Sequence, residues 1–115
     1  MIVHPGVGAT AITANEARLY MTSRLKAWPN GVPVKVFVLP DEDPLHRRFA
    51  NVVLGLYPYQ LRRVWDRQLF SGTGQVPTTV ATDVEMIRRV AATPGALGYV
   101  GSIPADAPVR PLEVR

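Results

Sequence analysis

Hydrophobic and polar positions follow two rhythms along the chain, one typical of strands and one typical of helices. Apolar residues run almost without interruption from Val34 to Leu39, which predicts a strand covered on both faces. Shorter apolar runs at 2–3 and 96–100 predict two further strands, and residues 78–81 form a short extended piece. Helices are expected between these strands, because apolar residues there recur every three or four positions.

Local signals mark where the helices begin. The sequences at 13–16 and 82–85 have the pattern of a capping box, and the first of them predicts a helix that reaches about Ala27. Asp43 followed by Pro44 is a favourable start for another helix. Another helix is expected after the Tyr57-Pro58 pair, before the one that starts at 82–85. In the helix after Pro44 the side chains expected to face the core are Leu45, Phe49, Val52, Val53 and Leu56. In the helix after Pro58 they are Leu61, Val64, Trp65, Gln68 and Leu69, and in the helix after Thr82 they are Val84, Ile87 and Ala91. Trp28 and Phe70 are also expected in the core.

The alternation of strands and helices predicts the α/β class, with a small mostly parallel or mixed sheet and helices on both of its faces. A length of 115 residues, 47% of them hydrophobic, fits one domain over 1–115. Three prolines punctuate the tail at 102–115, so this segment is expected to add at most an edge strand. The chain has no cysteine, which excludes disulfides, thiolate zinc sites and cysteine nucleophiles.

The charge balance is moderately basic, with 13 Lys and Arg against 9 Asp and Glu. These basic residues are dispersed, with no run of three, which favours a solvated surface over a nucleic-acid interface. A base-stacking platform would need exposed aromatic residues between the basic ones. No apolar stretch approaches the length of a membrane span, and residues 1–4 reach a proline without the apolar core of a signal peptide.

Few residues in the sequence suggest a catalytic or binding site. The sequence Ser71-Gly72-Thr73-Gly74 could cradle an anion with its backbone amides, but it follows a helix and lacks the lysine of a phosphate loop. A glycine that ends the helix, followed by a turn, is the favoured interpretation. The acidic run 41–43 is interpreted as a helix start rather than as a catalytic or calcium site. His4 and His46 are expected at the surface, since neither has a second ligand at metal spacing.

The order of these segments resembles the periplasmic-binding-protein-like domain of phosphate ABC transporter substrate-binding proteins, in a short, single-lobe form. The resemblance runs from about Val3 to Gly101, and its most specific part is the segment 93–100, TPGALGYV. It implies one three-layer lobe of a type II periplasmic-binding-protein-like fold, a non-enzymatic solute-binding function and a periplasmic or exported location. The family holds its anion through an Arg-x-x-x-Ser-Gly-Thr pattern at a helix start.

The positions that match this pattern are Leu39 for the arginine and Asp43-Pro44-Leu45 for Ser-Gly-Thr, so none of the side-chain donors is present. Pro44 also removes an amide that would face the anion. The resemblance therefore implies a solute-binding-like module with a degraded phosphate motif, which binds phosphate or another small anion weakly or contacts a protein. A homodimer and an envelope protein remain open as partners.

Two alternatives stay open at this stage. One is a genuine anion binder that uses the 71–74 loop, and the other is a nucleic-acid-associated basic protein. The candidate ligand-binding residues are Asp43, Ser71, Gly72 and Thr73. No residue is predicted to be catalytic, no metal site or cofactor is expected, and an enzyme is the least favoured class.

Overall fold

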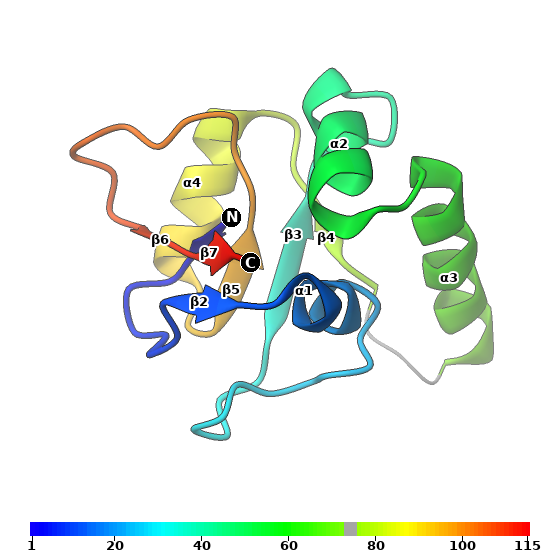
Figure 1. Cartoon of the computed structure of the whole chain (residues 1–115), viewed down its shortest axis with the longest axis horizontal. Coiled ribbons are helices and arrows are strands. Elements are labelled where there is room, and N and C mark those ends of the chain that lie inside the picture. Colours follow the sequence, from blue (N-terminus) through cyan, green and yellow to red (C-terminus); the bar gives the residue numbers. More distant parts are fainter. Residues whose placement is uncertain (73–75) are drawn as a thin grey trace.

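The computed structural model describes residues 1–72 and 76–115 and shows a five-stranded mixed sheet with helices around it (Figure 1). The strand order is β4-β3-β5-β1-β6. Strand β3, which lies between β4 and β5, is parallel to both, whereas β1 is antiparallel to β5 and β6. The strands are β1 (Ile2–Val3), β3 (Lys35–Val38), β4 (Thr78–Thr79), β5 (Ala96–Gly98) and β6 (Arg110–Pro111). A separate parallel pair joins β2 (Ala11–Ile12) to β7 (Glu113–Val114).

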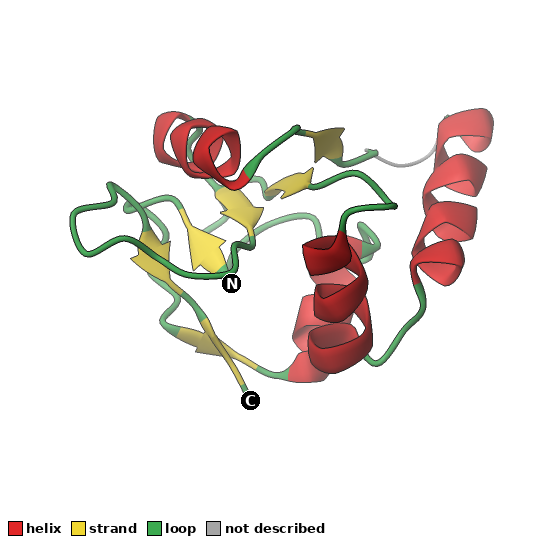
Figure 2. Cartoon of the chain, turned by 90° about the horizontal axis from the view of Figure 1, so that it is seen from above, coloured by secondary structure: helices red, strands yellow, loops and turns green. Residues whose placement is uncertain are grey.

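Helices lie on both faces of this sheet, as the sequence predicts. Helix α4 (Asp83–Ala92) covers one face, and α1 (Ala14–Met21) packs with the π-helix η1 (Phe49–Leu54) on the other (Figure 2). The short helix α2 (Pro44–Arg48) runs directly into η1, and α3 (Pro58–Ser71) stands at the outer end of the molecule. The α/β class with a mixed sheet is confirmed.

The predicted helix starts are found at the expected residues. In α1 the Thr13 hydroxyl accepts from the Glu16 amide at 3.0 Å, and the Glu16 carboxylate accepts from the Thr13 amide at 2.9 Å. Thr82 caps α4 by accepting from the Glu85 amide at 3.2 Å. Helix α1 ends at Met21 and not near Ala27, because Ser23 adopts a left-handed φ of 60° that a helix cannot continue.

The π-helix changes which residues face the core. Each π-turn closes a hydrogen bond to i+5, so it holds about one residue more than an α-turn and rotates the positions that follow. Ala50 and Leu54 are therefore buried, while Val52, predicted to face inward, is 75% exposed. A similar correction applies to α4, where Met86 and Val90 are buried and Val84 is 78% exposed.

Helix α3 touches the rest of the protein along a narrow line. Of its fourteen residues only Leu61 and Trp65 are buried. Leu69 and Phe70, predicted to lie in the core, are 63% and 88% exposed. Trp28, Phe49 and Trp65 are buried as predicted. The outer face of α3 thus carries large side chains that nothing in the described chain covers.

Candidate functional site

The parallel strands β3 and β5 end at the same edge of the sheet, where ligands of open α/β sheets commonly bind. Helix α2 begins at this edge. The Asp43 carboxylate accepts a hydrogen bond from the Leu45 amide at 2.9 Å, and Pro44 occupies the first position of the helix. The protein's own carboxylate therefore takes the place that a bound anion would occupy at a helix start.

A second carboxylate of the acidic run has a cationic partner that the sequence did not indicate. Asp41 accepts two hydrogen bonds from the Arg62 guanidinium of α3, at 2.8 and 2.9 Å. This paired geometry holds the pKa of Asp41 below its ordinary value and raises that of Arg62. The pair ties the loop after β3 to the outer helix.

His46 lies beneath this loop and is fully buried, which contradicts the surface position predicted for it. Its Nδ1 atom is hydrogen-bonded to the Tyr99 hydroxyl, and the same hydroxyl accepts from the Leu39 amide at 3.0 Å. The hydroxyl is both a donor and an acceptor, so it pairs with His46 Nδ1 in either tautomer of the imidazole: it donates when Nδ1 is unprotonated and accepts when Nδ1 carries the proton.

The environment of His46 favours the neutral form of its imidazole. Nε2 has no hydrogen-bond partner among the described residues, and it lies 3.9 Å from Asp41 Oδ1. Burial lowers the pKa of His46, an effect that the nearby Asp41 carboxylate partly opposes. Burial also raises the pKa of Tyr99 well above its ordinary value. At this edge of the sheet the Leu39 amide, the Tyr99 hydroxyl and His46 therefore form a neutral, buried hydrogen-bond network.

A cavity of about 360 Å³ lies at the opposite end of β3, between this strand and the segment that follows α1. Its apolar surface comes mainly from Tyr20, Leu25, Val34, Val36, Phe37 and Val76. Thr78 and Thr93 add hydroxyl groups, and Gly72 forms part of the border. The second cavity described, of about 170 Å³, lies beside Tyr99 and Gly101.

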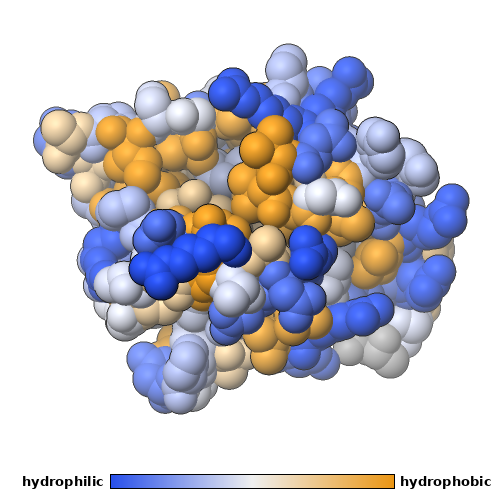
Figure 3. Space-filling view, in the orientation of Figure 1, coloured by the Kyte–Doolittle hydropathy of each residue, from blue (hydrophilic) through white to orange (hydrophobic). Residues whose placement is uncertain are grey.

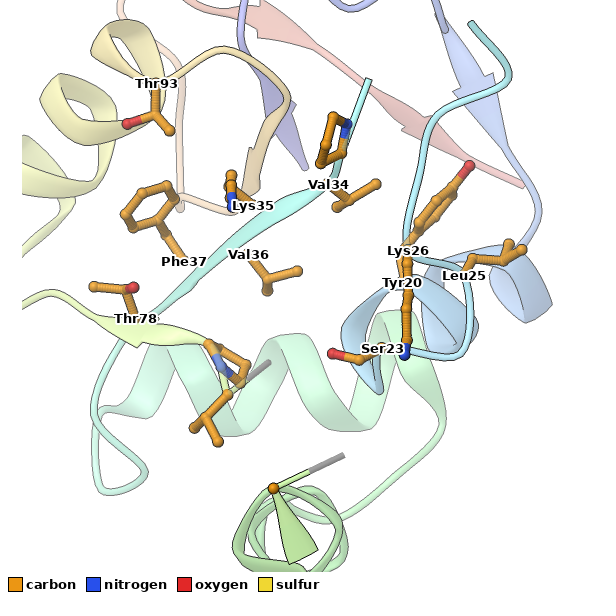
Figure 4. A pocket seen from close by; sticks show the side chains of 14 residues that line it. Tyr20, Ser23, Leu25, Lys26, Val34, Lys35, Val36, Phe37, Thr78 and Thr93 are labelled. Carbon is orange, nitrogen blue, oxygen red and sulfur yellow. The ribbon is translucent and has the colours of Figure 1, made fainter. Parts of the chain in front are cut away.

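Both lysines of the chain, Lys26 and Lys35, line the larger cavity. They are brought together by a turn: the Val34 amide donates to the Lys26 carbonyl at 3.0 Å, and Ala27 pairs with Pro33. In Figure 4 Val34 and Val36 point to one side of β3, where Lys26 also lies, and Lys35 and Phe37 point to the other, so the two lysine side chains approach the cavity from opposite sides of the strand. Among the described residues no carboxylate lies within 4.0 Å of either lysine amine.

The candidate residues from the sequence do not meet in one site. Asp43 lies beyond the carboxyl end of β3, whereas Ser71 and Gly72 end α3 near the other end of this strand (Figure 1). Gly72 has a left-handed φ of 68° and its amide donates to the Gln68 carbonyl, as in a glycine helix stop. The Ser71 hydroxyl donates to the same carbonyl at 3.3 Å. Thr73, the fourth candidate, lies outside the described residues.

Comparison with solved structures identifies the architecture. PstS from Borrelia burgdorferi matches 98% of this chain with a TM-score of 0.73 and 14% sequence identity. This is a periplasmic-binding-protein-like α/β fold. The match covers 45% of the PstS chain, so the present chain spans less than half the length of that protein. No family model and no curated protein matches the sequence.

The binding-protein-like fold places the two ends of β3 in different chemical settings. The carboxyl edge carries Asp43 and the Asp41–Arg62 pair, while the other end carries two lysines around an apolar cavity. Across residues 1–72 and 76–115 no group of three His, Asp or Glu side chains is arranged to hold a metal ion. None of the helices in the described part of the chain is long and apolar enough to cross a bilayer.

Sequence reasoning missed His46, Tyr99 and the two lysines. The signal for His46 was its helical spacing to Phe49 and Ala50, which are buried beside it. The signal for the lysines was their position on either side of the turn at 27–33, together with their being the only two in the chain.

Proposed function

We propose that the protein is a non-enzymatic solute-binding module that takes up a small anion in the cavity beside β3. The observation that carries this proposal is the gathering of both lysines of the chain at one cavity of about 360 Å³. This volume lies within the range of roughly 300–1,000 Å³ typical of small-molecule sites. The binding-protein-like fold supports a solute-binding role. In this proposal residues 1–115 form one lobe.

The lining favours an organic anion with an apolar body over bare phosphate. Val34, Val36 and Leu25 offer a surface on which an alkyl or aryl group packs, and such burial contributes roughly 25 cal/mol per Å². The Lys26 and Lys35 amines supply positive charge without a competing carboxylate in the described part of the chain. Both lysines are exposed, so their attraction for an anion weakens as salt rises.

Phosphate at the start of α2 is disfavoured, and this supports placing the ligand elsewhere. The Asp43 carboxylate already accepts from the Leu45 amide, and Pro44 has no amide proton to offer. An anion placed about 5 Å from one carboxylate is repelled by about 3 kcal/mol at an effective dielectric constant of about 20. The degraded motif therefore acts against high-affinity phosphate binding.

Isothermal titration calorimetry at low salt tests the proposed site. The ligands are sodium phosphate, acetate and hexanoate, the last of which adds an apolar chain to the same carboxylate. We expect hexanoate to bind more tightly than acetate or phosphate, and Lys26→Ala to weaken hexanoate binding by roughly tenfold, equivalent to about 1.4 kcal/mol. Arg47→Ala, which removes an exposed cation on α2, serves as the matched control and is expected to leave affinity unchanged.

The opposite ranking contradicts the proposal. If phosphate binds most tightly and Asp43→Ser strengthens it further, the ligand lies at the start of α2 and the cavity is not the site. If neither Lys26→Ala nor Lys35→Ala changes hexanoate binding, the lysines have no part in recognition.

A periplasmic or exported location is also part of the proposal, since it follows from the resemblance to transporter receptors. Fractionation of cells that produce the native gene product tests it. Recovery in the cytoplasmic fraction alone would contradict export.

A further inference from the structure

The outer face of α3 carries large side chains that no other described segment covers. Leu61 and Trp65 attach this helix to the body, and the opposite side faces solvent at the end of the molecule (Figures 1 and 2). Phe70 and Tyr59 are 88% and 61% exposed on this side. Figure 3 shows hydrophobic and hydrophilic side chains interspersed over the face of the molecule drawn there. Large exposed aromatic residues of this kind mark interaction surfaces more often than arbitrary surface.

Four side chains form a single line along this face. Tyr59, Arg63, Asp66 and Phe70 follow one another at spacings of four, three and four residues, which places them on one side of a helix. The line lies opposite the buried Leu61 and Trp65, since these residues fall about half a turn away. Its two ends are aromatic and its middle carries one cation and one anion.

This line is complementary to itself when reversed. If two α3 helices lie antiparallel with their midpoints between Val64 and Trp65, Tyr59 of one copy faces Phe70 of the other at each end. In the same register Arg63 of each copy faces Asp66 of the other. A parallel arrangement instead brings Arg63 against Arg63 and Asp66 against Asp66. We infer that the partner of this surface is a second copy of the chain, packed through α3 in an antiparallel, two-fold symmetric dimer.

The charges on α3 favour this occupant. Arg63 has no carboxylate within 4.0 Å among the described residues. The side chain of Asp66 is 51% exposed and lies 3.6 Å from Arg62, whose guanidinium already holds Asp41 in a two-bond pair. Asp66 can therefore accept a second cation. A polyanionic partner such as nucleic acid or an acidic membrane would meet this carboxylate at the centre of the face.

The aromatic ends supply most of the attraction. Tyr57 stacks on Tyr59 with ring centroids 5.8 Å apart, which widens the apolar end that Phe70 of the second copy would contact. Aromatic pairs contribute about 0.5–1.5 kcal/mol beyond their buried area. One pair of helices buries less than the roughly 1,200–2,000 Å² of a standard interface, so we expect a weak dimer with a dissociation constant in the micromolar range or above.

Sedimentation equilibrium over a concentration series from about 10 µM to about 1 mM tests the dimer and its register. Arg63→Asp places carboxylates opposite each other across the two-fold axis, and Asp66→Arg places guanidinium groups there. Each single variant is expected to dimerise at least about tenfold more weakly than the wild type, because like charges oppose association. An equimolar mixture of the two variants is expected to recover the wild-type affinity, since every facing pair is then of opposite charge.

Two further variants test whether dimerisation depends on the α3 face or on any exposed apolar side chain. Phe70→Ser is expected to weaken the dimer by about tenfold or more through loss of the aromatic contact. Val84→Ser removes an apolar side chain that is 78% exposed on α4, and it is expected to leave the dimer unchanged. Circular dichroism of each variant confirms that α3 remains folded.

Several outcomes would overturn the inference. A protein that stays monomeric to about 1 mM has no such dimer. A dimer that survives Arg63→Asp and Phe70→Ser uses another surface, and failure of the variant mixture to associate refutes the antiparallel register. Binding of phosphatidylglycerol vesicles or single-stranded DNA that Arg63→Asp abolishes, without dimerisation, assigns the face to a polyanion. These readouts are independent of hexanoate binding, so the dimer and the solute site stand or fall separately.

Discussion

Trp65→Ala is expected to lower the free energy of unfolding by about 3–5 kcal/mol, the usual cost of removing a buried tryptophan. The Trp65 side chain is 1% exposed, and its indole N–H donates to the Met21 carbonyl at 2.9 Å. This contact fastens α3 to the end of α1. The substitution leaves a cavity and an unpartnered carbonyl, so both packing and hydrogen bonding are lost.

Chemical denaturation followed by circular dichroism measures this loss. Phe70→Ala is the matched control, because it removes an aromatic side chain from the same helix at a position that is 88% exposed. It is expected to change the free energy of unfolding by no more than about 0.5 kcal/mol. Equal effects of the two substitutions would contradict the attachment of α3 through Trp65.

The same attachment positions two other features. Arg62, one turn before Asp66 on α3, reaches the loop after β3 and holds Asp41. If Trp65 fixes the helix, Arg62 is fixed with it, and the carboxyl edge of the sheet is stabilised from outside. The surface proposed for dimerisation also depends on this helix holding a constant orientation.

Local signals in the sequence were sufficient for much of the fold. The capping residues at 13–16 and Asp43-Pro44 act within one helical turn, so their patterns predicted the helix starts correctly. The continuous apolar run that contains β3 likewise predicted a strand that has neighbours on both sides in the sheet. The α/β class followed from the alternation of these elements.

Contacts between distant residues account for what the sequence could not supply. Asp41 and Arg62 are 21 positions apart, and His46 and Tyr99 are 53 apart, so neither pair leaves a local pattern. The π-helix shifts the inward face by a residue, which misplaced Val52. Phe70 was assigned to the core on hydrophobicity alone, although α3 extends beyond the surface it packs on.

The candidate binding site shows the same division. Asp43 was correctly placed at a helix start, because an N-cap is a local feature. In the sequence the two lysines contribute only to the charge count and form no motif. The cavity that they line exists because a turn and the end of α3 meet beside β3. The residues that line the cavity are spread between positions 20 and 93, so no contiguous sequence motif marks the site.

The buried His46 is expected to make the protein sensitive to mild acid. Burial lowers its pKa in the folded state, whereas the unfolded chain keeps the ordinary value of 6.5. Below about pH 6.5 the unfolded chain therefore binds more protons than the folded one, and protonation favours unfolding. The contribution of the neutral histidine is fully present above this pH and is lost as the pH falls toward the folded-state pKa.

The groups around His46 set the size of this effect. Asp41, Asp43 and Glu42 raise its pKa, and Arg62 together with burial lowers it, with burial the largest influence. In the protonated imidazole both ring nitrogens are donors, so the Tyr99 hydroxyl, which already accepts from the Leu39 amide, can then only accept at Nδ1. Between about pH 6.5 and 5 we expect the free energy of unfolding to decline as the pH falls, with a slope no steeper than about 1.4 kcal/mol per pH unit, the value for one proton.

Urea denaturation at a series of pH values measures the slope, and His46→Gln is expected to flatten it between about pH 6.5 and 5. His4→Gln, at the histidine near the amino end, is the matched control and should preserve the slope. The pKa of Asp41 is lowered from 3.8 by Arg62, so its own contribution is lost at more acidic pH and does not overlap this range. An NMR titration of the wild-type imidazole provides a second readout that needs no variant. A folded-state pKa for His46 at or above 6.5, or an unchanged slope in His46→Gln, would show that the buried imidazole does not control the response to acid.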